Sequence, residues 1–227
     1  MKTFKRYTIL ISGLLIVVLL GCKKSEPVPS MHYEYFGMEK GRYIVYNVVE
    51  IDHEDEFDIH DTTYYQLKTV WDQPYIDNEG RTACEFHRLK RNDASEEWVQ
   101  TDVWTGIIDD ARRAEMIEEN QRRIKLVFAP SSEKIWDANV YNTLGEQESY
   151  YEDIHKSATV GGTYFDSTLI VEQGNELNFV WDIRIYEKYA KGVGMIEWFY
   201  KVNDYQGSAT VWKGKEIYYT FVTTGIE

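Results

Sequence analysis

From residue 41 onward, apolar and polar residues alternate over short stretches, the two-residue period of β-strands. Tyr, Val, Ile, Thr, Trp and Phe dominate these stretches, and turn-forming residues interrupt them about every ten positions. In residues 163–173, for example, Phe165, Leu169 and Val171 share one face of the expected strand. The pattern predicts an all-β domain.

Two pairs of expected strands are joined by sequences that favour tight turns. Gly161-Gly162 separates residues 150–160 from residues 163–173, and two glycines supply positive φ without strain. Asp77-Asn78-Glu79-Gly80 separates residues 62–76 from residues 81–90 in the same way. Further strands are expected at 42–51, 179–189, 193–202 and 215–224.

Residues 109–123 are compatible with either a helix or a strand. They are rich in Ala, Arg, Glu and Gln, which favour helix. From Ala114 onward, however, apolar positions fit a period of two better than 3.6, so we favour a strand over 109–118. The next stretch is expected to be a strand with Ile124 and Lys125 on opposite faces.

About ten strands linked by short turns predict one antiparallel sheet. So many strands must curl or split into packed sheets. We therefore expect residues 41–227 to form a single β domain with a strongly curved, half-barrel or barrel-like sheet.

The first 24 residues have a different character. Lys2, Lys5 and Arg6 are basic, and residues 8–21 are apolar or small, a stretch shorter than the ~20 residues of a spanning helix. Leu19-Leu20-Gly21-Cys22 ends this stretch, and two lysines follow. The arrangement resembles the lipobox signal peptide of bacterial lipoproteins.

The resemblance implies that residues 1–21 are a signal peptide with a short helix, cleaved before an acylated Cys22. Two or more acyl chains hold a protein stably on a membrane. Residues 22–40 are polar and contain Pro27 and Pro29, so we expect a lipidated tether. The chain would then be lipid-anchored in the cell envelope. Lys23-Lys24-Ser25-Glu26 lacks the Asp that often marks inner-membrane retention, which favours the outer membrane. An uncleaved signal anchor or an ordinary secreted protein are the alternatives.

A second, looser resemblance concerns the body of the chain. Tyr189-Ala190-Lys191-Gly192-Val193-Gly194 resembles a turn of uncharacterised β-rich envelope lipoproteins built on curved sheets. This short motif is structural, so it implies a fold and no function.

Charge and cysteine content exclude several functions. The formal net charge is −13, and the first 21 residues carry three basic and no acidic residues, so the remainder is near −16. This balance excludes nucleic-acid partners and charge-driven docking on anionic lipid. Once Cys22 is acylated, Cys84 is the one thiol left, so no intramolecular disulfide is expected.

Motifs for catalysis and cofactor binding are missing from the sequence. It contains no G-x-S-x-G and no S-x-x-K motif, and Gly192 and Gly194 are only a fragment of a phosphate-binding loop. We therefore predict no catalytic residue and no cofactor.

The acidic stretch 50–61 is the strongest metal candidate in the sequence. It contains His53 and His60 but no Gly, which a calcium loop of the EF-hand type needs. We interpret it as a solvated hairpin loop and predict no metal ligand, with a metal site as the alternative.

Aromatic residues, 15% of the chain, are the remaining candidates for function. Tyr and Trp combine an apolar body with a polar tip, which suits stacking on sugars or lining an apolar pocket. Trp181, Trp198, Tyr200 and Tyr219 are the candidate ligand-binding residues, on the concave face of the sheet. Cross-strand packing is the alternative explanation of the same residues.

Together these features predict a non-enzymatic envelope lipoprotein that acts in binding or assembly. Its expected partners are the membrane, through the lipid anchor, and either envelope proteins or a small apolar or glycan ligand. One alternative is a binder of a small molecule, lipid or glycan, and another is a glycosidase-like envelope hydrolase. A large apolar cavity would favour the binder, a filled core with an apolar surface patch would favour assembly, and converging carboxylates in a polar cleft would favour the hydrolase.

Overall fold

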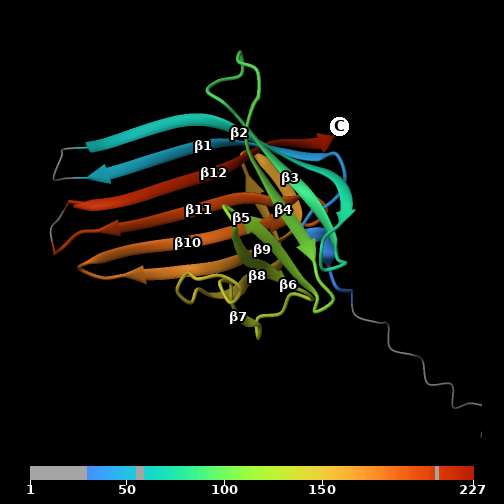
Figure 1. Ribbon diagram of the computed structural model, residues 1–227. Helices are drawn as coiled ribbons and strands as arrows, with labels where there is room; N and C mark the ends of the chain where they lie inside the picture. The colour runs from blue at the N-terminus through green and yellow to red at the C-terminus, as the bar shows by residue number, and fades with distance from the viewer. Residues whose placement is uncertain (1–29, 55–58, 208–209) are drawn as a thin grey trace, which may run out of the picture. The chain divides into compact units, whose positions relative to one another are not determined.

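The computed structural model describes residues 30–54, 59–207 and 210–227, which fold into β-strands and one short 3₁₀ turn (Figure 1). The predicted signal helix and Cys22 lie outside these residues. The elements are η1 (Tyr33–Tyr35), β1 (Arg42–Glu54), β2 (Ile59–Ile76), β3 (Thr82–Arg91), β4 (Val99–Ile108), β5 (Arg113–Glu118), β6 (Gln121–Val127), β7 (Ile135–Asp137), β8 (Glu148–Val160), β9 (Thr163–Leu177), β10 (Trp181–Ala190), β11 (Gly194–Asp204) and β12 (Lys213–Ile226).

All the strands belong to one antiparallel sheet with the order β6-β5-β4-β3-β2-β1-β12-β11-β10-β9-β8-β7. Two runs of consecutive hairpins, β1 to β6 and β7 to β12, join where β12 pairs with β1 in the middle of the sheet. The prediction of a single curved antiparallel sheet is confirmed. The described residues contain 12 strands rather than about ten.

The sheet is nearly closed into a barrel, because its first strand, β6, meets its last two strands. The Ile124 amide donates to the carbonyl of Ala138, just after β7, at 2.9 Å. On β8, the Tyr151 hydroxyl accepts from the Val127 amide at 2.7 Å and donates to the Val127 carbonyl at 3.0 Å. We call this junction the seam. Few backbone bonds cross it, so side chains supply much of its closure.

Closure gives the sheet an inner face, where two clusters of buried side chains pack. Aromatic residues contribute to both, which explains much of the aromatic content of the chain. The first cluster includes Tyr35, Phe36, Trp71, Phe128, Tyr151 and Tyr189. The second includes Tyr46, Val160, Phe165, Ile196, Tyr219 and Phe221.

Several local predictions are confirmed, and one is wrong. Gly161 and Gly162 both have positive φ, 57° and 81°, as a tight two-residue hairpin requires. Residues 113–118 form strand β5, not a helix, but the strand is shorter than expected, because residues 109–112 form the turn before it. Phe179, expected inside a strand, instead lies in the turn before β10, because Asn178 forms that turn with hydrogen bonds to the Val180 and Trp181 amides.

The folded body begins earlier than expected, at Met31. Residues 31–40, which the sequence assigned to the tether, pack on the body at the β10–β11 turn. Tyr35 and Phe36 insert into the first core cluster with exposed fractions of 0% and 4%. The Glu34 carbonyl accepts from the Gly192 amide at 2.9 Å, in the β10–β11 turn. We call this segment the strap.

The strap and the β9–β10 turn lie at opposite ends of the body. In Figure 1 the strap, in blue, is on the right, whereas the β9–β10 hairpin, in orange, ends on the left. Strand β10 connects the two ends, since it runs from that turn to the turn that contacts the strap. Its ten residues span about 33 Å.

The Gly161-Gly162 turn generates a mutational prediction. A Cβ at Gly161 would overlap the carbonyl oxygen of Phe221, whereas a Cβ at Gly162 would enter open space. Positive φ costs an alanine about 1–2 kcal/mol at either site. We expect Gly162→Ala to lose about that much in urea unfolding, and Gly161→Ala to lose clearly more. Gly80→Ala, also at positive φ in open space, is the matched control. Equal losses at Gly161 and Gly162 would contradict the packing of this turn on β12.

Candidate functional site

The inner face encloses a cavity of about 80 Å³ between the two core clusters. Its walls are largely aromatic and apolar, with Phe36, Trp71, Phe86, Trp104, Trp198 and Tyr219 among the lining residues. Four charged side chains also line it: Arg88, Glu118, Lys125 and Glu187. A few charges inside an aromatic cavity are a typical arrangement for holding a polar group in place.

Lys125 is the centre of the charged group. Its ammonium lies 3.0 Å from a Glu118 carboxylate oxygen and forms an ion pair and hydrogen bond with Glu187. The Tyr189 hydroxyl donates to the other Glu187 oxygen at 2.6 Å. These contacts link β5 and β6 with β10 across the seam.

A β-bulge explains why Lys125 points inward. Leu126 pairs with Ala114 and Ile124 pairs with Glu115, so Lys125 is an extra residue in β6. A bulge changes the direction of a side chain relative to simple alternation. The period-two pattern of the sequence therefore did not reveal that Lys125 lies in the cavity beside two carboxylates.

The surroundings shift the titration of this group. Burial alone lowers the pKa of the Lys125 ammonium, but Glu118 and Glu187 outweigh it, so the net pKa is raised above its ordinary value. Burial, and then the charge of Glu187, raises the pKa of the Tyr189 hydroxyl well above 10.0. Lys125 therefore stays charged and Tyr189 stays neutral at pH 7, which suits them to hold a structure together rather than to exchange protons.

Arg88 carries the second positive charge in the cavity. Its guanidinium donates to the Tyr219 hydroxyl at 2.9 Å and lies 3.9 Å from the centre of the Trp104 ring. Asp102 is 3.4 Å away on the neighbouring strand β4. Tyr219 thus holds a cation in place in addition to packing in the core.

The four aromatic residues predicted to bind a ligand do not form one site. Trp198 and Tyr219 line the cavity, with ring centres 4.9 Å apart. Tyr200 lies one step farther along β11, with its ring centre 5.8 Å from that of Trp198. Trp181 is at the start of β10 and is 38% exposed. The inner face therefore brings Trp198 and Tyr219 together and leaves Trp181 at the end of the body.

The size of the cavity limits what it can hold. Pockets for drug-sized ligands measure roughly 300–1,000 Å³, and a cavity of about 150 Å³ accepts benzene. At about 80 Å³ this cavity is smaller than either, so in the described form it suits ordered water or a very small polar molecule. Most of the interior is filled.

Large apolar side chains are exposed together at the β9–β10 turn. Leu177 is 79% exposed, Phe179 is 92% exposed and Val180 is 42% exposed, and Trp181 follows directly. We call residues 177–181 the distal tip. Leu177 and Phe179 are far more exposed than large apolar side chains usually are. Contiguous exposed apolar surface of this kind is typical of interaction sites.

Hydrogen bonds hold the distal tip in one conformation. The Asn178 side-chain oxygen accepts from the amides of Val180 and Trp181 at 2.7 and 2.8 Å. The Tyr205 amide donates to the Val180 carbonyl at 2.7 Å, which ties the tip to the segment after β11. The apolar side chains are therefore presented on an ordered turn, which lowers the entropy cost of binding.

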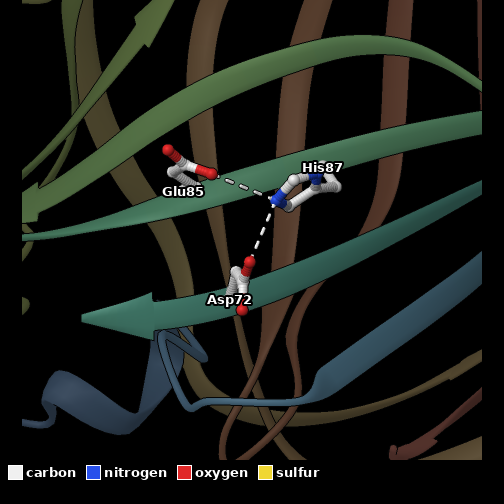
Figure 2. A group of neighbouring side chains, drawn as sticks. All are labelled: Asp72, Glu85 and His87. Carbon is white, nitrogen blue, oxygen red and sulfur yellow. Dashed lines mark ion pairs between the residues drawn. The ribbon is translucent and has the colours of Figure 1, made fainter. Parts of the chain in front are cut away.

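A third group of candidate side chains lies on the outer surface. Asp72, Glu85 and His87 meet on strands β2 and β3, and their potential metal-ligating atoms all lie within 4.8 Å of one another (Figure 2). Nothing in the sequence pattern pointed to them, because Asp72 is 13 positions before Glu85.

The acidic stretch 50–61 is mostly strand rather than loop. Residues 50–54 belong to β1 and residues 59–61 to β2, while residues 55–58 lie outside the described structure. His53 and His60 are cross-strand partners, with their Nδ1 atoms 3.1 Å apart. The other ring nitrogen of His53 lies 3.3 Å from Glu216, so these donors do not converge on one point.

The chain matches no protein family, no curated protein and no solved structure. Within the described ranges, no helix has the length and hydropathy needed to cross a membrane.

The charged group in the cavity can be tested by mutation. Lys125→Met should leave the buried carboxylate of Glu187, 3% exposed, without its cation, so we expect a loss of about 3–5 kcal/mol in urea unfolding at pH 7. Adding Glu187→Gln to Lys125→Met should recover part of the loss, because the unpaired charge is removed. An unchanged stability of Lys125→Met, or no recovery in the double variant, would contradict the described network.

Proposed function

We propose that this chain is a lipid-anchored protein of the cell envelope that binds another protein through its distal tip and performs no catalysis. The anchor rests on the resemblance of residues 1–24 to a lipobox signal peptide, with Cys22 as the acylated residue. The outer membrane is the expected location. The binding role rests on the structure of the body.

The distal tip is the observation that carries this proposal. A filled interior leaves little room for a ligand, whereas Leu177 and Phe179 are largely exposed on an ordered turn. Each such side chain gains about 1.5–3 kcal/mol when it is fully buried. A few such side chains usually contribute most of the binding free energy of a protein interface.

Geometry favours a protein partner over the anchoring bilayer. The tether from Cys22 to residue 30 can span about 30 Å when fully extended. Strand β10 alone is about as long, and the tip lies at the end of the body opposite the strap. With the body upright on its tether, the tip would therefore point away from that membrane.

Charge around the tip leads to the same conclusion. Glu176 precedes it in sequence, and Asp204 lies at the end of the neighbouring strand β11, whereas Asp182, which follows the tip, is paired with Lys201. These carboxylates, on a chain with a net charge near −16 without its first 21 residues, are repelled by anionic lipid. The partner that fits has an apolar pocket with basic residues at its rim.

Site-specific photo-crosslinking in living cells tests this proposal. A photoreactive residue in place of Phe179 should yield one discrete protein adduct, which Leu177→Asp should abolish. The same probe in place of Ile76, 67% exposed at the end of β2, is the matched control and should yield no such adduct. Cys22→Ser should move the protein to the soluble fraction and weaken the adduct of an envelope partner.

Different outcomes would contradict different parts of the proposal. Adducts with lipid alone, or equal adducts at positions 179 and 76, would reject the distal tip as a protein-binding surface. Sedimentation of Cys22→Ser with membranes to the extent of the natural chain would reject the lipid anchor.

A further inference from the structure

We propose that Asp72, Glu85 and His87 form a binding site for a divalent transition-metal cation, with zinc as the cation that fits it best. The site lies on the outer surface, away from the distal tip, and does not depend on the proposed function. Imidazole and carboxylate together are a donor set that zinc accepts.

Strand pairing brings the three side chains to one surface. Glu85 and His87 are two residues apart on β3, so they lie on the same face of the strand. Asp72 lies at an irregularity in β2, where the pairing with β3 skips from Trp71 to Pro74. Figure 2 shows the His87 ring nitrogen directed between the two carboxylates.

The two distances from His87 to the carboxylates fit a metal centre. His87 Nε2 lies 3.4 Å from an Asp72 oxygen and 3.3 Å from a Glu85 oxygen. Zinc bonds of 2.0–2.1 Å in a tetrahedron place neighbouring donor atoms about 3.3 Å apart. A cation between the three groups would therefore reach bonding distance with small side-chain movements.

The hydrogen bonding of the imidazole also fits a metal ligand. His87 Nδ1 lies 2.9 Å from the Gln100 side-chain oxygen, which can only accept, so Nδ1 carries the proton. Nε2 then faces the two carboxylates. No hydrogen bond from any described residue reaches Nε2, and that atom is shielded from water. A cation at this point would be bound by Nε2 and both carboxylates. The hydrogen bond to Gln100 would hold the His87 ring in the orientation that binding needs.

A surface cavity of about 310 Å³ adjoins the site and provides access to it. Asp72, His87 and Gln100 line this cavity together with Lys40 and Glu227. With three ligands from the protein, a tetrahedral cation keeps one position open toward solvent. Water or an anionic group, within reach of Lys40, would complete the coordination.

A protonated imidazole paired with the two carboxylates is the competing explanation, and zinc titration separates the two. Calorimetry of the metal-stripped full-length protein with zinc chloride should show one site per chain, and zinc should raise its melting temperature. Cobalt chloride should give the visible absorption of a tetrahedral centre. Glu85→Gln should weaken zinc binding, and His87→Gln should abolish it.

Two further variants separate a site at His87 from other binding. Gln100→Leu should weaken zinc binding roughly tenfold, because the orienting hydrogen bond is lost. His60→Gln, which removes an exposed strand histidine elsewhere, is the matched control and should bind as the natural chain does. The Glu85 side chain is 49% exposed, so Glu85→Gln should fold as the natural chain does. It therefore tests the site even if His87→Gln fails to fold. The proposal is overturned if zinc leaves the melting temperature unchanged, or if binding is lost in His60→Gln and retained in His87→Gln.

Discussion

The contact between the Tyr151 hydroxyl and the backbone of Val127 is the interaction on which the rest of the structure depends. The Tyr151 hydroxyl pairs with both the amide and the carbonyl of Val127, as a neighbouring strand would at the edge of β6. Tyr151 is 3% exposed, so both groups would be costly to leave unpaired. Without this contact the Val127 end of β6 would be an open edge of the sheet.

Closure at the seam determines what the interior can do. It turns one face of the sheet into a packed core, and it brings Lys125 on β6 within reach of Glu187 on β10. The charges that meet there are paired with each other, and little volume remains beside them. The candidate binding surfaces therefore lie on the outside, where the distal tip exposes apolar side chains and Asp72, Glu85 and His87 converge.

Elements with an uninterrupted period-two pattern could be predicted from the sequence. The prediction fails where a bulge or a tertiary contact changes the direction of a side chain. The Gly161-Gly162 hairpin and strand β5 follow from local pattern, because glycine chemistry and the spacing from Ala114 are both local signals. Lys125 could not be placed in this way, since one extra residue in β6 turns it inward. The strap was missed because Tyr35 and Phe36 stand in a polar stretch, and only the folded barrel shows the pocket that they fill.

The closed seam is tested most directly by amide hydrogen exchange at Val127. Its amide donates to Tyr151, whereas the amide of the next residue, Phe128, donates to the Arg112 carbonyl on the other side of the strand. A closed barrel predicts that both amides exchange slowly and at similar rates, because both need the same large opening. Slow exchange at Phe128 with unprotected exchange at Val127 would show an open edge at β6, and would contradict a sheet closed around a filled core.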